Sequence, residues 1–499
     1  MGVIKNQGLK QSIVTYMGVL IGVVNNLYIF PEYLEVEELG LFRFLIDTSM
    51  LLFPFVSLGI HNLSVRMFPT FKDEGKGHNG LLFFLLVGVL GGYLFFLVIA
   101  FILKPFIISL LASESALIQQ YWIYLLPLAG LTLVGAIFTQ WVLNFKKIVL
   151  PAIFNDIYIK VGMPIIAIVY ALKMVTLTQA IYLLIGIFLL RVLSFIVYIN
   201  IIKEWNLRPN WSFLSKPLKR EMGVYSFYGL LGSLGSMLAT RIDVFMVALL
   251  ATNELEDVGI YTTAFFIANI ITVPARAINN IASPVIAESY KTEDYDNIKT
   301  IYQKSSIILL TFGILFLIGI WASIDDLFTL MPKGDIFAKG KYVILIMGLG
   351  KLFDLATGAN SEIIAFSKWF RFNFYAVLIL AVVNVISNFI LIPIHQINGA
   401  AIATTVSLVL FNMSKYLYIK HKMGIQPFTA KTLKLILIGV VTYFIGMNLS
   451  SIGNTFLDII LRSGIISLLY VGAIWYFKIS EDLNELIIQG LAKVGIKVN

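Results

Sequence analysis

The chain has 499 residues, of which 59% are hydrophobic and only 13% are charged, and its mean hydropathy is +0.89. These values exclude a soluble globular protein. The absence of cysteine excludes disulfides, thiol catalysis and cysteine-ligated metals. The net charge of +9 could indicate a nucleic-acid partner, but the basic residues flank apolar segments instead of forming a patch. Membrane topology therefore explains the charge better than nucleic acid does.

Apolar segments of about 20 residues recur along the whole chain, and each is long enough to cross ~30 Å of hydrocarbon. The segments are continuous rather than alternating, which indicates transmembrane helices and not a barrel. The first of them, Leu9 to Phe30, is interpreted as a spanning helix and not as a cleavable signal peptide. In chain order, the sequence predicts an all-α membrane protein with about fourteen transmembrane helices, at residues 8–30, 39–62, 80–103, 119–143, 148–171, 176–202, 222–250, 258–282, 302–324, 342–365, 371–393, 398–420, 430–449 and 457–477.

The distribution of basic residues predicts the orientation of these helices. Most of the 37 lysines and arginines lie in the N-terminal tail, the even-numbered loops and the C-terminal tail, as Lys146, Lys147 and Lys368 do. Because loops rich in Lys and Arg stay on the cytoplasmic side, we expect both termini to be cytoplasmic in a bacterial inner membrane.

An acidic octapeptide occurs twice. Glu35–Phe42 (EVEELGLF) returns about 219 residues later as Glu254–Tyr261 (ELEDVGIY), so that Gly40 matches Gly259. The spacing is too long for a solenoid repeat and indicates a duplicated half-protein. Six predicted spans separate the copies, and this even number gives both copies the same orientation. The sequence thus predicts a parallel repeat whose axis lies along the membrane normal.

The duplication also predicts the domain organisation. A shift of about 221 residues places 121–203 over 342–424, which pairs Phe145–Lys147 with Phe366–Lys368. We expect an N-terminal six-helix lobe at 1–205 and a C-terminal six-helix lobe at 206–425. Two additional transmembrane helices follow at 426–478. A cytoplasmic amphipathic tail at 479–499 would lie either on the membrane surface or on the protein itself.

Charged residues inside predicted spans are candidate functional residues, because each costs at least ~2.5–3.5 kcal/mol at bilayer depth. Several are spaced to pair on one helix face, which would neutralise them structurally: Arg43 with Asp47, Asp156 with Lys160, and Lys351 with Asp354. Glu362 has no such partner on its own helix. The substrate-cavity candidates are Arg241, Asp243, Arg191, Lys351, Asp354, Asp156 and Lys160.

Arg241 and Asp243 differ from the spaced pairs. Two residues apart on a helix, they point about 200° from each other, so at least one must face another helix or a watery lumen. Arg191 lies mid-span with no acidic residue within one helical turn. Arg191 and Arg241 either line a central cavity or form cross-helix salt bridges that serve packing alone.

Two six-helix lobes with two extra spans, and a Gly-x-aromatic motif in both octapeptides, resemble one known family. It is the polysaccharide-transporter branch of the multidrug/oligosaccharidyl-lipid/polysaccharide exporter superfamily, which includes the O-antigen-type lipid-linked oligosaccharide flippases. In span 7 that family often shows an acidic residue, a short apolar stretch and a Gly-x-Tyr turn, matched here by Asp243, residues 244–250 and Gly259–Tyr261. The first copy departs from this pattern, because Val24 stands where Asp243 stands in the second.

The resemblance implies a transporter that is not an enzyme and needs no cofactor. It would flip a polyprenyl-pyrophosphate-linked oligosaccharide, such as an O-antigen, capsule or exopolysaccharide unit, from the cytoplasmic to the periplasmic leaflet by alternating access of the two lobes. The pyrophosphate brings at least two negative charges, which arginines in a cavity would bind. Its partners would be this substrate, membrane lipids and enzymes that polymerise or assemble the polysaccharide, with no nucleic acid.

Three alternatives remain open. Multidrug or cation antiporters of the same superfamily usually have twelve spans and an acidic residue in span 1, whereas residues 8–30 contain none. A membrane polysaccharide polymerase or glycosyltransferase needs a loop with clustered acids, and the longest outer loop, Asp325–Lys341, is short. A scaffold that transports nothing would have a collapsed interior. The four histidines are scattered and no Walker motif occurs, so the sequence indicates no catalytic or metal site.

Overall fold

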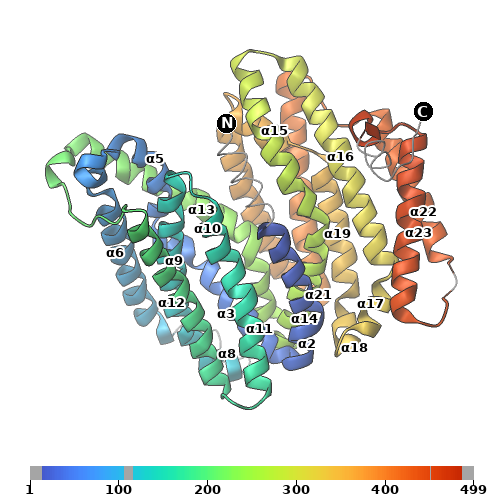
Figure 1. The fold of residues 1–499 in the computed structure, drawn as a ribbon, viewed down its shortest axis with the longest axis horizontal. Coiled ribbons are helices and arrows are strands. Elements are labelled where there is room, and N and C mark those ends of the chain that lie inside the picture. Colours follow the sequence, from blue (N-terminus) through green and yellow to red (C-terminus); the bar gives the residue numbers. More distant parts are fainter. Residues whose placement is uncertain (1–13, 106–115, 450, 486–499) are drawn as a thin grey trace. The chain divides into compact units, whose positions relative to one another are not determined.

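The computed structural model describes residues 14–105, 116–449 and 451–485, and in these residues the chain forms helices and no strands (Figure 1). The chain is a multi-pass membrane protein. It divides into two compact units, residues 1–259 and 260–499. The domain boundaries expected from the duplication stay a prediction.

The first unit contains the helices up to α13 and the first turn of α14. Its main helices are α2 (Phe30–Tyr33), α3 (Val36–Leu51), α4 (Phe53–Ser57), α5 (Ile60–Phe71), α6 (Leu81–Ile102), α8 (Ala116–Tyr121), α9 (Leu125–Asn144), α10 (Val149–Ala152), α11 (Tyr158–Ala171), α12 (Leu177–Ile201) and α13 (Lys216–Leu250).

The second unit contains the remaining helices. They are α14 (Glu254–Asn269, of which the first turn belongs to the first unit), α15 (Val273–Lys291), α16 (Tyr295–Ala322), α17 (Ile324–Leu330), α18 (Gly334–Phe337), α19 (Lys341–Ala356), α20 (Asn360–Phe366), α21 (Arg371–Met423), α22 (Ala430–Met447) and α23 (Thr455–Tyr476).

The predicted all-α membrane fold is confirmed. Among the described residues, 12 helices are long and apolar enough to cross a membrane, and a pair bent by 46°, Gly334–Ala356 with Asn360–Phe366, makes a thirteenth. The 53-residue α21 contains two predicted spans, 371–393 and 398–420. It breaks at Gln396, whose φ of 53° and ψ of −136° lie outside the helical region. This break lies between the two predicted spans.

Local sequence signals explain where several helices begin and end. In α3, Glu35 and Glu38 form a reciprocal capping box, with the Glu35 amide donating to Glu38 Oε2 at 3.0 Å. The Ser215 side chain accepts from the Leu218 amide at the start of α13. At the other end, α21 stops at Gly424, whose φ of +69° suits glycine. The first acidic octapeptide thus caps the N-terminus of the second transmembrane helix.

The core of each unit is formed by helices buried on several sides. In the first unit α9 packs against α3, α4, α5, α6 and α12, and its Leu133, Ile137 and Trp141 are fully or almost fully buried. In the second unit α16 packs against α15, α19, α22 and α23. Helices at the centre of a bundle bury apolar residues all round, and this explains why hydropathy located them well.

The two octapeptides cross each other through their glycines. A Cβ atom at Gly40 would overlap the backbone carbonyl of Leu255, and a Cβ atom at Gly259 would overlap the backbone carbonyl of Val36. Val36 and Leu255 occupy equivalent positions in the repeat, so the two contacts are the same contact with the copies exchanged. We call this contact the glycine crossing. Each helix needs glycine there because the opposing atoms belong to backbone that cannot rotate away.

The start of the C-terminal tail packs on the protein. Ile479 is 1% exposed and Leu483 is 7% exposed, and Lys304 Nζ contacts Asp482 Oδ1 at 3.0 Å. Ile479 belongs to a cluster that includes Tyr470 of α23 and Leu435 of α22. The rest of the predicted amphipathic tail, residues 486–499, lies outside the described residues.

Candidate functional site

The long helix α13 packs along α3, α4 and α5, and side chains along much of its length line two cavities. Side chains between Lys216 and Tyr228 line one cavity, and residues Gly229 to Met237 line a second. Arg241 follows Met237 by four residues. Residues four apart are neighbours on a helix and advance about 40° around its axis, so these positions form one row that winds around α13, here named the α13 stripe.

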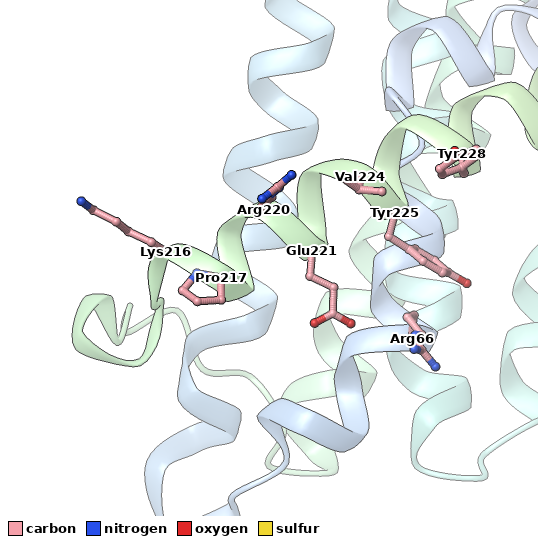
Figure 2. A pocket seen from close by; sticks show the side chains of 8 residues that line it. All are labelled: Arg66, Lys216, Pro217, Arg220, Glu221, Val224, Tyr225 and Tyr228. Atoms are coloured by element: carbon pink, nitrogen blue, oxygen red, sulfur yellow. The ribbon is translucent and has the colours of Figure 1, made fainter.

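The first cavity contains an excess of cations and two exposed tyrosines. Its volume is about 690 Å³, and Arg66 on α5 lies over the ring of Tyr225 with its Cζ 5.9 Å from the ring centre. Figure 2 shows Glu221 and Tyr225 extending from α13 toward Arg66. The cavity is lined by Arg66, Lys216, Pro217, Arg220, Glu221, Val224, Tyr225 and Tyr228. The lining thus contains three cations and a single carboxylate, and this excess of positive charge favours anions at this end of the stripe.

The second cavity, of about 390 Å³, is polar without charge. Asn62 Nδ2 donates to the Gly229 carbonyl and to Ser233 Oγ, both at 3.3 Å. The two ring nitrogens of His61 lie within hydrogen-bonding distance of Ser57 Oγ (3.2 Å) and Ser233 Oγ (3.4 Å). Hydroxyls and amides of this kind can exchange partners with water or with sugar hydroxyls.

A sharp bend between α4 and α5 brings these polar groups to α13. Leu58 and Gly59 both take left-handed conformations, with φ of 46° and 73°. A Cβ at Gly59 would overlap the backbone of α13 at Ser226 and Leu230. Glycine therefore permits both the turn and the close approach, and the approach sets His61 and Asn62 against the stripe.

At the far end of the α13 stripe lies a cluster of charges from three segments. Arg241 forms an ion pair with Asp47 on α3, and the same carboxylate interacts electrostatically with Arg43. Arg43 Nη2 donates to Asn26 Oδ1, and its guanidinium lies 5.3 Å from the centre of the Phe30 ring. We name Arg43, Asp47, Arg241 and Asn26 the arginine cluster.

The arginine cluster carries more positive than negative charge. Two guanidinium groups share one carboxylate, and Arg43 Nε is buried without a hydrogen-bond partner among the described residues. The Arg241 side chain keeps 40% of its surface exposed, whereas that of Asp47 keeps 12%. At 1.5 Å per residue, Arg43 and Asp47 lie about 11 and 17 Å from the start of α3, and Arg241 about 14 Å from the end of α13. Such depths fall near the middle of ~30 Å of hydrocarbon.

Asn26 reaches Arg43 from a π-helical turn, Asn25–Ile29, in the first span. Asn25 Nδ2 donates to the Lys160 carbonyl at 2.6 Å, and Asn26 Nδ2 donates to the Gly22 carbonyl at 2.7 Å. Turns of this kind are rare and occur frequently at functional sites. The turn leaves Asn26 Oδ1 as the acceptor for the arginine.

The structure places the other predicted candidates of the first unit away from this cluster. Asp243 is 2% exposed and, two residues from Arg241, points about 200° from it around the helix. Arg191 is 5% exposed, packs against Gly135 of α9 and donates to the Leu131 carbonyl at 3.3 Å. No carboxylate forms an ion pair with Arg191 among the described residues. Its role in a cavity stays a prediction.

Two spacings that suggested ion pairs along one helix stand in more complex surroundings. Asp47 forms an ion pair with Arg241 and also interacts electrostatically with Arg43. Asp156 lies in a second π-helical turn, Ile153–Ile157. A π-helical turn shifts the backbone register by one residue, so the geometry of Asp156 and Lys160 departs from that of a regular α-helix, and their pairing stays a prediction.

In the second unit, the predicted Lys351 and Asp354 belong to different hydrogen-bonded groups. Lys351 Nζ donates to Asn269 Oδ1 at 2.7 Å, and Asp354 Oδ1 accepts from Asn412 Nδ2 at 2.8 Å. Asn412 Oδ1 accepts in turn from Asn360 Nδ2 at 3.0 Å. Both candidates therefore lie in polar contacts between helices.

The hydrogen-bonded groups around Asp354 also include Lys415, a residue that spacing along one helix does not identify as a candidate. Lys415 is 1% exposed and donates to Ser361 Oγ at 2.8 Å, and its Nζ lies 3.8 Å from the centre of the Phe411 ring. It interacts electrostatically with Asp354 and Glu362. Glu362 Oε2 is buried without a hydrogen-bond partner among the described residues. In the same residues, no three His, Asp or Glu side chains come together as metal ligands would.

Comparisons with known proteins agree with this architecture. The fold is similar to that of the lipid II flippase MurJ in an inward closed conformation, with a TM-score of 0.74 and 16% identity over 94% of this chain and 98% of that one. An inward-facing multidrug resistance MATE family transporter of the MOP superfamily gives 0.61 and 14% over 83% and 98%. A MOP superfamily transporter from Pyrococcus furiosus gives 0.56 and 14% over 84% and 95%. No curated protein sequence matches the chain.

Two sequence families match parts of the chain. The MatE family matches residues 230–390, and the family described as polysaccharide biosynthesis protein matches residues 8–290, which is more than half of the chain. The second match covers the α13 stripe and the arginine cluster. It confirms the resemblance noted in the sequence. The chain belongs to the polysaccharide biosynthesis protein family and has a fold shared with transporters of the MOP superfamily.

Proposed function

We propose that the protein is a flippase that moves an oligosaccharide linked to polyprenyl pyrophosphate from the cytoplasmic to the periplasmic leaflet of a bacterial inner membrane. The observation that carries this proposal is the α13 stripe. A cavity with three cations lies at one end of the stripe, an uncharged polar cavity lies in the middle, and the arginine cluster lies at the other end. The chain's membership of the polysaccharide biosynthesis family supports it.

The chemistry of the stripe suits the two halves of such a substrate. Arg241, with part of its guanidinium exposed, and Arg43 would bind phosphate oxygens, since arginine offers paired N–H donors to phosphate. Asn62, Ser233 and His61 would exchange hydrogen bonds with sugar hydroxyls, and Tyr225 and Tyr228 offer flat apolar faces for sugar rings. The polyprenyl chain would remain in the lipid.

Transport in this proposal is alternating access of two lobes around a central cavity. Both termini would be cytoplasmic, and the chain would catalyse no covalent reaction and need no cofactor. The transported unit would belong to an O-antigen, a capsule or an exopolysaccharide, and a polymerase and glycosyltransferases would act before and after it. Among the cavity candidates, Arg241 is assigned to the pyrophosphate. Asp243, Asp156, Lys160, Lys351 and Asp354 are assigned to the cavity or to its support, and Arg191 is assigned to helix packing.

The test replaces Arg241 by alanine and by lysine in cells whose surface polysaccharide depends on this protein. A hydrogen bond to a charged group contributes about 1.5–3 kcal/mol, so Arg241→Ala is expected to lower transport about 10- to 150-fold at equal protein level. Lysine keeps the charge and loses the paired donors, and an intermediate loss is expected. Lys219→Ala, an exposed residue of α13 outside both cavities, is the control. Full surface polymer from Arg241→Ala would refute the assignment.

A second candidate function is export of drugs or cations. The MatE match over residues 230–390 and the fold shared with MATE transporters favour it. Expression in a strain lacking its own exporters separates the two functions. A flippase would leave drug resistance unchanged, whereas an exporter would raise it and leave surface polysaccharide unaffected.

A further inference from the structure

A second cationic and aromatic pocket lies in the second unit, where the α15–α16 turn, the α20–α21 turn and the end of α21 meet. Its volume is about 530 Å³. It is lined by Tyr290, Tyr295, Phe366, Lys368, Trp369, Lys422 and Met423. None of these residues belongs to the α13 stripe, and the proposed function makes no use of them.

The lining groups select for an anion with a small organic body. Lys368 and Lys422 are its two charged residues, and no carboxylate lines the pocket. Lys368 Nζ lies 5.0 Å from the centre of the Trp369 ring, which holds the ammonium at the wall of the pocket. Among the described residues, neither Lys368 nor Lys422 forms an ion pair with a carboxylate. Both ammonium groups therefore remain available to a ligand.

A phenol adds a neutral donor to the two cations. The Tyr290 hydroxyl donates to Met423 Sδ at 3.3 Å, a weak acceptor that a phosphate oxygen would readily replace. Burial, with a contribution from nearby Tyr295, raises the pKa of Tyr290 to about 12. The hydroxyl therefore keeps its proton at physiological pH and can donate to an anion without repelling it.

Exposed aromatic residues around the pocket point to a membrane surface. Phe366, Phe370 and Tyr375 are 45%, 56% and 59% exposed, which is unusual in water but typical of residues at the level of lipid headgroups. Lys368 also lies in a loop that the distribution of basic residues predicts to be cytoplasmic. The cytoplasmic leaflet is the one rich in anionic lipids, and basic pockets between helices on that side suit their headgroups.

We propose that this pocket binds the phosphate headgroup of an anionic phospholipid, with Lys368 and Lys422 on the phosphate and the rings of Trp369 and Tyr295 against the glycerol. A bound lipid would join the α15–α16 turn to the end of α21. Lipids would then stabilise the second unit according to their headgroup charge and not merely as solvent. The site is independent of the flippase proposal, because neither lysine lies on the α13 stripe.

The test uses the full-length protein in detergent, titrated with short-chain phosphatidylglycerol or phosphatidylcholine and followed by native mass spectrometry and apparent melting temperature. Phosphatidylglycerol is expected to bind and to raise the melting temperature, and phosphatidylcholine is not. The Lys368→Gln/Lys422→Gln variant should bind phosphatidylglycerol at least tenfold more weakly, since it loses two charge-assisted contacts. The Lys368→Arg/Lys422→Arg variant should retain binding.

Lys420→Gln/Lys431→Gln, two exposed lysines outside the pocket, is the matched control. Equal melting temperatures of all variants without lipid show that they are folded. Equal binding of the two lipids, or an equal loss in the control variant, would overturn the proposal. Inorganic phosphate that gives the same stabilisation at the same concentration would assign the pocket to a soluble anion and would equally overturn the lipid assignment.

Discussion

Alanine at Gly40 is expected to destabilise the protein by separating two helices at the glycine crossing. The added Cβ would overlap the Leu255 carbonyl, a backbone atom that can give way only if α3 and the start of α14 move apart. Overpacking of a tight contact costs about 1–3 kcal/mol, and a backbone obstacle places the cost near the upper end. Alanine also favours a helix by about 1 kcal/mol over glycine. The expected net loss is thus about 2 kcal/mol.

Gly186→Ala on α12 supplies the matched control, because a Cβ atom there meets no atom within 4 Å. It keeps the helical gain of about 1 kcal/mol without the overlap, so the two variants should differ by about 3 kcal/mol. With an unfolding entropy of about 2 cal/mol/K per residue over the whole chain, this difference corresponds to about 3 °C in apparent melting temperature. Melting in detergent, followed by loss of the monodisperse gel-filtration peak, is the assay.

The double variant Gly40→Ala/Gly259→Ala sharpens the test. One separation of the two segments makes room for both methyl groups, so the double loss should be smaller than the sum of the single losses. Strict additivity would show that the two glycines pack independently. A Gly40→Ala variant as stable as Gly186→Ala would refute the crossing itself.

Three further predictions concern the buried charges. Lys415→Met leaves Asp354 and Glu362 without their cation and should lower the free energy of unfolding by about 3–5 kcal/mol, measured by thermal unfolding. Adding Glu362→Gln to this variant should restore part of the lost stability. If it restores none, the loss is not electrostatic in origin. Arg191→Met replaces a buried guanidinium that has no carboxylate partner by an apolar side chain of similar volume. The melting temperature and transport should therefore be unchanged or improved. Loss of transport at a normal melting temperature would instead support a role of Arg191 in the cavity. Arg462→Ala removes contacts to Asp326 (2.6 Å) and the Ala322 carbonyl (2.9 Å) and should lower the melting temperature more than the control Lys478→Ala does. Equal melting temperatures of the two variants would exclude a structural role for Arg462.

The spans and the duplication could be predicted from the sequence because both depend on the order of residues along the chain. The length of an apolar span is set by the thickness of the bilayer, so the apolar runs coincide with helices, and the break in α21 at Gln396 lies between two of them. The octapeptides could be recognised because the close contact between them requires glycine at the same position of both copies.

Partners of charged residues could not be predicted in the same way. Arg43 and Asp47 are well spaced on one helix, but Asp47 pairs with Arg241, and the spacing within α3 contains no information about α13. A π-helical turn at Ile153–Ile157 likewise changes the helical register around Asp156, which the spacing of residues does not reveal. Lys415 lies five residues from Lys420, near the end of a predicted span, where a lysine ordinarily reaches the membrane surface. Only the helices packed around it make it a buried charge.

The glycine crossing also has the pattern of a contact between two identical chains. Gly40 contacts Leu255, and Gly259 contacts Val36, the residue that corresponds to Leu255 in the first copy. Such an exchange of equivalent contacts is typical of an isologous interface between identical subunits. Two identical half-length chains could form the same contact, with the glycine beside a twofold axis. In a single chain the two sides can differ, and Arg241 faces Asp47 while its counterpart, Gly22, has no side chain. A symmetric homodimer could not have built a site with a different chemistry on each side of its axis.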